Sequence, residues 1–294
     1  MRTVVIAAAI VAACATAPAE AQVQCQPAGF SRVELDTLKA AEWDLPDDAR
    51  RNALARGLTA CLSNPDPTLR DGIAFEALTH WLRGRQLSPE TIQWLADDLE
   101  PRLAAPEGAG FERPFAALVL SEVARADRIE AYMTAERRTR LLDAAISYFT
   151  GVRDYRAFDE REGWRHGVAH GADLLLQLAL NPAFDRAELT RIRDSLATQL
   201  APDGHFYTYG ESERIARPVI FMAQRELFSS EEWRDWLVRH TAVPADAFSS
   251  QAGLARRHNM MAFLSVLYMQ ASLSENEADD ALLSGAEAAL RGLP

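Results

Sequence analysis

Apolar residues recur every three or four positions along most of the chain, the spacing that places them on one face of an α-helix. Residues 68–84 show this spacing, with inward positions at Leu69, Ile73, Phe75, Leu78 and Leu82. Capping signals stand where such segments begin, as in Ser31 with Glu34, Ser88 with Pro89, Asp185 with Glu188, and Ser229 with Glu232. Alternating Val, Ile and Thr runs bounded by hairpin turns are absent from the sequence. The pattern therefore predicts an all-α protein of about twelve helices.

Short loops between the predicted helices favour packing of each helix against its neighbour in the chain. Residues 66–74 are similar to the start of a HEAT-type repeat, but no period is regular enough to define a repeat family. We predict one all-helical domain over residues 22–294, built as a curved stack of helical hairpins, a HEAT-like α/α superhelix. The alternatives are an α/α toroid and a compact bundle.

Residues 162–180 form the most unusual stretch of the chain. Read as one helix at about 100° per residue, they place five polar residues in a stripe about 60° wide, namely Glu162, His166, His170, Asp173 and Gln177. Apolar residues cover the other faces. An ordinary surface helix has one apolar stripe and a broad polar back. We therefore expect protein on most sides of this helix, with the polar stripe facing a groove or an internal network.

Three glycines stand four residues apart in the same stretch, at Gly163, Gly167 and Gly171. Each glycine inside a helix costs about 1 kcal/mol relative to alanine. Three of them along one flank of the polar stripe predict close approach by a second helix or by a ligand, and helix packing is the favoured explanation.

The polar stripe carries candidate metal ligands. His166, His170 and Asp173 have the spacing i, i+4, i+7, and imidazole with carboxylate at that spacing can hold zinc or another divalent ion. The pattern lacks the intervening glutamate of the metalloprotease motif, and a complete site needs ligands from elsewhere. The alternatives are a metal-free groove for a polar ligand or for catalysis, and a structural network in which every imidazole is hydrogen-bonded.

Residues 209–217 form a second candidate stretch. Glu211 and Glu213 follow a turn, and Glu213 has the i, i+4 spacing of an ion pair with Arg217. One of these carboxylates facing the polar stripe would serve as a metal ligand or a general base. The alternative is a solvated cluster of capping residues and ion pairs. The residues expected to line the groove are Glu162, Trp164, His166, His170, Asp173, Glu211, Glu213 and Arg214.

The first 21 residues have the pattern of an export signal. Arg2 is the charged start, residues 3–13 form an apolar run too short to span a bilayer, and Ala19-Glu20-Ala21 is the cleavage site. We expect cleavage after Ala21, a periplasmic location and a mature chain without a transmembrane span. Residues 11–14 also fit a lipoprotein box, and the alternative is therefore a lipid anchor on Cys14.

Either processing route leaves Cys25 and Cys61. In an oxidising periplasm, two cysteines without a third predict one disulfide that ties the N-terminal segment to the second helix. Two buried free thiols are the alternative.

The formal charge of the 294-residue chain is −11, which argues against nucleic acid or an anionic membrane as a partner, because both need a basic patch. The sequence has no Gly-x-Ser-x-Gly elbow, P-loop or dinucleotide fingerprint. It therefore gives no support to a serine hydrolase, an NTPase or a Rossmann enzyme.

The run Gly163-Trp164-x-His166-x-x-Ala169-His170-Gly171-Ala172-Asp173-Leu174-Leu175 resembles the most distinctive segment of an uncharacterised bacterial family, domain of unknown function 2785. Two other runs, Asp66-Pro67-x-Leu69-Arg70-Asp71 and Glu211-x-Glu213-Arg214, are similar to flanking motifs of that family. The resemblance covers about residues 50–270. It implies an all-helical fold and supports the polar stripe as the site, and it implies no activity.

Two hypotheses about function follow. The first is an exported protein whose groove binds a small polar ligand, a peptide or an envelope component. The second is a hydrolase in which His166, His170 and Asp173, with Glu211 or Glu213, bind a metal or act as general acid and base.

Overall fold

The computed structural model describes residue 25 and residues 27–294, so the predicted export signal and Cys14 lie outside the described residues. The described chain is helical almost throughout, which confirms the all-α prediction. Its α-helices are α1 (Arg32–Ala40), α2 (Asp48–Leu58), α3 (Pro67–Leu69), α4 (Glu76–Arg83), α5 (Pro89–Leu99), α6 (Glu112–Ile129), α7 (Ala135–Gly151), α8 (Gly167–Ala179), α9 (Arg186–Ala197), α10 (Glu211–Ala223), α11 (Ser230–His240), α12 (Gln251–Leu273) and α13 (Asp280–Arg291).

Shorter elements join these helices. Two antiparallel strands, β1 (Phe158–Asp159) and β2 (Gly163–Trp164), form a small hairpin. A π-helical turn, η3 (Arg70–Phe75), connects α3 to α4. The 3-10 turns are η1 (Pro27–Gly29), η2 (Thr59–Ser63), η4 (Pro101–Ala104), η5 (Ala247–Ser249) and η6 (Glu277–Asp279).

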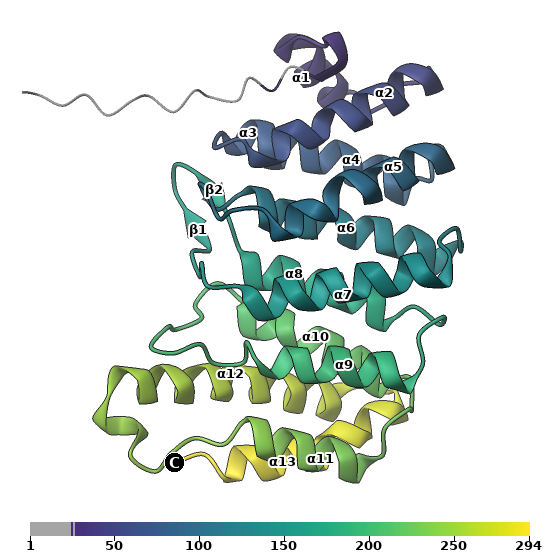
Figure 1. The fold of residues 1–294 in the computed structure, drawn as a ribbon. Helices are drawn as coiled ribbons and strands as arrows, with labels where there is room; N and C mark the ends of the chain where they lie inside the picture. Colours follow the sequence, from purple (N-terminus) through teal and green to yellow (C-terminus); the bar gives the residue numbers. More distant parts are fainter. Residues whose placement is uncertain (1–24, 26) are drawn as a thin grey trace, which may run out of the picture.

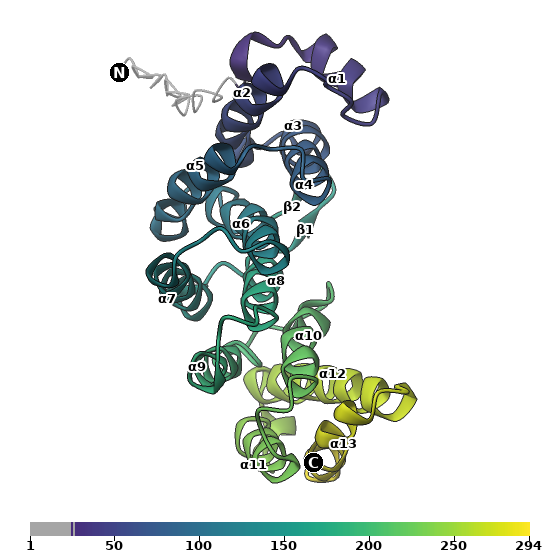
Figure 2. The ribbon, with the colours of Figure 1, turned by 90° about the vertical axis from the view of Figure 1, so that its right-hand side faces the viewer.

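The helices lie one above another in an elongated stack (Figure 1). Viewed along the helices, α4, α6, α8 and α10 follow one another in an inner row, with α5, α7 and α9 beside them in an outer row (Figure 2). This arrangement is a stack rather than the ring of a toroid. The HEAT-like repeat geometry stays a prediction.

Local signals explain where the helices begin. The predicted capping boxes form at the starts of α1, α9 and α11. In each box the side chain of the cap residue accepts a backbone N–H from the first turn, and the glutamate three residues later accepts the backbone N–H of the cap residue. Ser88 accepts the Thr91 N–H and Pro89 follows it as the first residue of α5. The buried apolar residues of both rows form one continuous core.

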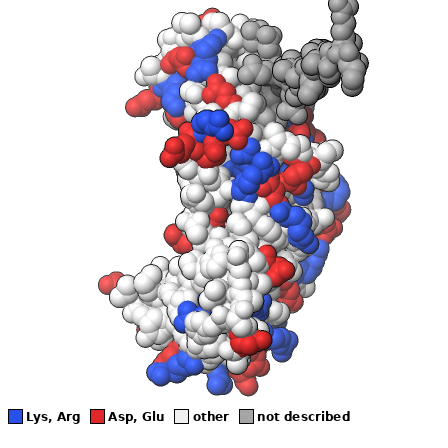
Figure 3. Space-filling view, turned by 90° about the vertical axis from the view of Figure 1, so that its left-hand side faces the viewer, with Lys and Arg blue, Asp and Glu red and all other residues white. Residues whose placement is uncertain are grey.

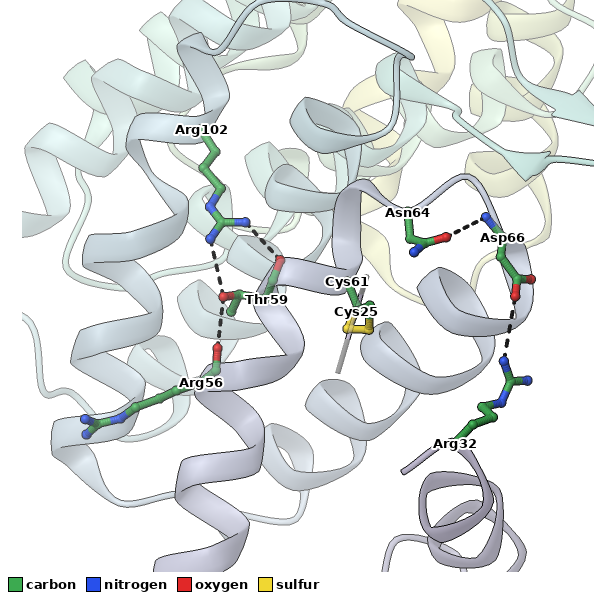
Figure 4. The surroundings of a disulfide bond; sticks show 8 residues. All are labelled: Cys25, Arg32, Arg56, Thr59, Cys61, Asn64, Asp66 and Arg102. Carbon is green, nitrogen blue, oxygen red and sulfur yellow. Dashed lines mark hydrogen bonds and ion pairs between the residues drawn. A yellow bond between two sulfur atoms is a disulfide. The ribbon is translucent and has the colours of Figure 1, made fainter. Parts of the chain in front are cut away.

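Cys25 and Cys61 are joined in a disulfide with their Cα atoms 5.0 Å apart (Figure 4). Cys61 lies in η2, directly after α2, so the predicted link between the N-terminal segment and the second helix is confirmed. Arg102 of η4 fixes the same turn, because its Nη1 donates a 2.9 Å hydrogen bond to the Thr59 carbonyl.

The prediction of one helix over residues 162–180 is wrong at its start. Gly163 and Trp164 form β2, and α8 begins only at Gly167. The hairpin keeps residues 163–166 out of the helix, because the backbone N–H groups of Arg165 and His166 donate to the carbonyls of Ala157 and Arg156. His166 precedes the helix in the left-handed region, with φ 53° and ψ 41°.

The glycine prediction is confirmed for Gly167 and Gly171, which face helix α7. A Cβ on Gly171 would lie 2.8 Å from a ring carbon of Phe149, and a Cβ on Gly167 would lie 3.2 Å from the Tyr148 hydroxyl. Gly163 lies outside the helix, with φ 70° and against the side chain of Pro67. Close helix packing therefore explains two of the three glycines. Among the described residues, no helix is both long and apolar enough to span a membrane.

Candidate ligand-binding cavity

A cavity of about 430 Å³ opens on the inner row of helices, where α4, α6, α8 and α10 approach the β hairpin. This volume lies in the range of small-molecule sites, about 300–1,000 Å³. Most of the lining side chains are polar. The lining residues are Asp71, Phe75, Arg83, Leu118, Ser121, Glu122, Trp164, His166, His170, Asp173, Leu176, Gln177, Tyr209, Arg214 and Arg217.

The cavity brings together most of the predicted groove, namely Trp164, His166, His170, Asp173 and Arg214. Three predicted residues do not line it. Glu162 points to Arg165, with 2.9 Å between the carboxylate and guanidinium, and Glu213 is exposed on α10. Glu211 is buried behind His166. The hairpin explains the position of Glu162, because this residue precedes β2 and does not lie on the helix that the prediction assumed.

Both imidazoles are buried, and each has a ring nitrogen without a hydrogen-bond partner among the residues that the structure describes. Nε2 of His166 lies 3.7 Å from Glu211 Oε1, which is too far for a hydrogen bond. Nδ1 of His170 has no partner within the described chain, although the His170 imidazole also interacts with the Pro114 backbone. The ring packs edge-on against Phe115 with 5.3 Å between ring centroids. A buried polar atom without a partner costs about 1–3 kcal/mol, so these two nitrogens require an explanation.

Burial controls the charge of both rings. Burial and the nearby Arg214 guanidinium lower the pKa of His166 to about 4, in spite of the Glu211 carboxylate. Burial, with His166 and Arg214 beside it, also lowers the pKa of His170 well below its ordinary value. Both imidazoles are therefore neutral at pH 7, and each offers one N–H donor and one acceptor nitrogen.

The backbone of His166 is itself unusual. Its φ of 53° lies in the left-handed region, which costs a non-glycine residue about 1 kcal/mol or more. The conformation turns the ring under Trp164, with which it stacks at 4.8 Å between centroids. Strained residues of this kind cluster at functional sites.

Arginine and carboxylate side chains form two ion pairs in the cavity wall. Arg214 Nε donates to Asp173 Oδ1 at 2.8 Å, and a second contact joins Arg214 Nη2 to Asp173 Oδ2. Arg83 Nε donates to Glu122 Oε2 at 2.9 Å, with a second bond from Nη2 to Oε1. Each pair is bidentate, a geometry that fixes both planar groups.

Asp71 contributes a third carboxylate, which sequence reasoning did not place in the site. It lies in the π-helical turn η3, a feature frequent at functional sites. Arg70 beside it is fully buried, with its guanidinium 4.0 Å from the Phe111 ring centroid and 2.7 Å from Asp71 Oδ2. Arg70 Nη2 also donates to the carbonyl of Glu162 at 2.6 Å. The Arg70-Asp71 pair therefore ties the first helical layers to the β hairpin.

The predicted ion pair of Glu213 with Arg217 does not form. Arg217 lines the cavity, and no ion pair or hydrogen bond in the described chain involves its guanidinium. Arg83, Ser121 and Glu122 carry no sequence signal for the site. Arg83 stands on α4 and the other two on α6, so only the stacking of these helices against α8 brings them to the site.

The three predicted metal ligands do not form a ligand set in this structure. Among residue 25 and residues 27–294, no group of three or more His, Cys, Asp or Glu side chains is arranged to hold a metal ion. Asp173 is held by Arg214, which competes with a cation for the carboxylate.

The family described as "Protein of unknown function (DUF2785)" matches residues 105–269. The chain belongs to this family. The DUF2785 region includes α6, the β hairpin, α8 and α10, whereas Asp71 and Arg83 precede it. Comparisons with curated proteins and with solved structures give no match. The family description names no activity, so the function has to be argued from the cavity.

Proposed function

We propose that this DUF2785 protein binds a small polar ligand in the cavity between α4, α6, α8 and α10. The observation that carries the proposal is the pair of buried imidazoles, His166 and His170, that line a cavity of ligand size and that each have a ring nitrogen without a hydrogen-bond partner among the described residues. A ligand hydroxyl, amide or carboxyl group would supply the missing partners. Its binding would recover the cost of leaving these atoms unbonded.

The cavity favours a small molecule over a peptide or an envelope protein. Its volume of about 430 Å³ suits a compact ligand, and polar groups line it from several sides. The side of the molecule that carries the hairpin shows positive and negative side chains interspersed, without a broad basic area (Figure 3). This mixed charge supports a partner other than nucleic acid, which needs a basic area.

A hydrolase that uses the same residues is the second candidate, because Glu211 lies 3.7 Å from His166. A general base works best with a pKa near the working pH, and the pKa of His166 is lowered to about 4. His166 would therefore be a weak base at neutral pH. Only one of the two imidazoles has this carboxylate neighbour, so binding is the better supported function.

Export to the periplasm is part of the proposal. The N-terminal pattern and the Cys25–Cys61 disulfide support it, because structural disulfides persist in oxidising compartments. The mass of the protein purified from a bacterial periplasm tests it. Cleavage after Ala21 is the expected result, a lipid-modified Cys14 would indicate an anchored form, and an uncleaved chain retained in the cytoplasm would contradict export.

A cavity-filling variant tests binding. Gln177→Trp places a large ring in the cavity, and Gln270→Trp makes the same change on the exposed face of α12 as a control. Thermal melting is measured with a library of polar metabolites. We expect some compounds to raise the melting temperature of the wild type and of Gln270→Trp but not of Gln177→Trp. Identical responses of all three proteins would contradict the proposal.

Elemental analysis of the same preparations addresses the metal alternative. Near-stoichiometric zinc in the wild type, lost from a folded His166→Ala/His170→Ala variant, would replace the metal-free proposal with a metal site.

A further inference from the structure

The charges in the cavity wall are almost fully paired. Each lining carboxylate has its own guanidinium: Asp71 lies 2.7 Å from Arg70, Glu122 lies 2.9 Å from Arg83, and Asp173 lies 2.8 Å from Arg214. These three pairs contribute no net charge to the wall.

Arg217 is the exception. It follows Arg214 by one turn of α10, lines the same cavity, and has no ion pair or hydrogen bond within the described chain. Glu211 lies outside the wall in the first turn of α10 and accepts the Tyr209 N–H at 2.9 Å. After burial, the charge of Arg217 is the next cause that lowers the pKa of Arg214, so the two guanidinium groups repel each other. Arg217 is therefore the one charged side chain lining the cavity that has no ion-pair partner among the described residues.

We propose that the ligand of this cavity carries a single anionic group, a carboxylate or a phosphate, bound by Arg217. This inference rests on the proposed binding function. A guanidinium presents its donors in a planar fork that matches both anions, and an anion beside Arg217 also offsets the repulsion on Arg214.

The rest of the cavity defines the remainder of the ligand. The neutral imidazoles of His166 and His170 each have one unpartnered ring nitrogen, a donor or an acceptor according to the tautomer, which suits hydroxyl or amide groups rather than a second anion. Trp164 and Tyr209 are partly exposed at the cavity and supply apolar contact area. The fitting class is a small acid with one anionic group and several hydroxyl or amide groups.

The test uses inorganic phosphate and acetate as probes of the anion site. Melting temperatures of the wild type, Arg217→Gln and Arg140→Gln are compared in increasing phosphate or acetate, with chloride holding the ionic strength constant. Arg140 is an exposed arginine on the outer helix α7 and has no ion pair with any described residue, so its replacement controls for the loss of one charge. Both arginines are exposed and unpaired, so both variants should fold.

We expect the wild type and Arg140→Gln to gain about 2–4 °C over Arg217→Gln at an anion concentration tenfold above the dissociation constant. A larger gain with phosphate identifies a phosphate site, and a larger gain with acetate identifies a carboxylate site. Equal responses of the three proteins to both anions would overturn the inference. The proposed function would survive that result if neutral compounds still distinguish Gln177→Trp from Gln270→Trp.

Discussion

Two of the buried polar networks in the described chain differ in completeness. The first surrounds Asp127 at the end of α6. Its carboxylate accepts the backbone N–H groups of Tyr132 at 3.0 Å and Met133 at 2.7 Å, the Arg138 guanidinium at 2.6 Å, and the Asn181 amide at 3.0 Å. Each hydrogen bond joins α6 to another segment of the chain, so this network stabilises the fold.

The second network surrounds the cavity and is incomplete. It also contains arginine–carboxylate pairs, such as Arg214 with Asp173, but His166 and His170 each keep a ring nitrogen without a partner. Ion pairs therefore do not distinguish the two networks, whereas unpartnered atoms do. The comparison indicates that the Asp127 network stabilises the fold and that the cavity network is completed by a ligand.

The largest effect is expected at Asp127. Asp127→Asn removes the charge that pairs with Arg138 and places an amide against donor groups, so we expect a loss of about 3–4 kcal/mol in the free energy of unfolding. Urea unfolding measures it, with Asp203→Asn in an exposed loop as the matched control. A loss below about 1 kcal/mol would contradict the claim that the Asp127 network stabilises the fold.

The pH dependence of stability should come next. The pKa of His166 is about 4 in the folded protein, against about 6.5 in the unfolded chain. Between these values the unfolded chain binds the proton and the folded protein does not, so stability falls as the pH is lowered from 6.5 to 4. His166 should contribute about 3 kcal/mol to that fall. Unfolding of His166→Gln across this range should show a correspondingly smaller slope, and an unchanged slope would contradict the burial of a neutral ring.

A smaller effect is expected where α8 packs on α7, the contact that positions His170. In Gly171→Ala the new Cβ would meet the Phe149 ring at 2.8 Å, and we expect a loss of about 1–3 kcal/mol. Gly151→Ala is the control, because a Cβ there meets nothing within 4 Å. Equal melting temperatures of the two variants would contradict tight packing of α8 on α7, because the Phe149 ring would then move aside at little cost.

The sequence predicted those parts of the fold that depend on local signals. Helix periodicity and capping boxes such as Ser229 with Glu232 depend on residues three or four apart, and the structure has them where expected. The start of α8 depends instead on the pairing of the hairpin and on the left-handed backbone of His166. The spacing of apolar residues contains no information on strand pairing or on a left-handed residue. The helix predicted over residues 162–180 therefore begins too early.

The site shows the same division. Spacing alone predicts that His170 and Asp173 lie together, and both line the cavity because they are one turn apart on α8. His166 lines the cavity from the end of the hairpin rather than from the helix. Arg83 and Glu122 come from separate helices, and their meeting depends on how α4 and α6 stack. The i, i+4 spacing predicts an ion pair of Arg217 with Glu213, whereas in the structure Arg217 lines the cavity.

The most direct test of the central claim is the free energy of unfolding of His170→Leu, measured beside Asp127→Asn. Leucine has about the volume of imidazole and removes a buried nitrogen that has no partner, so we expect a change within about 1 kcal/mol, or a small gain. That result, beside a large loss for Asp127→Asn, would show that the cavity network is not needed for folding. A loss of about 3 kcal/mol or more for His170→Leu would contradict the account, because it would make the imidazole a structural group.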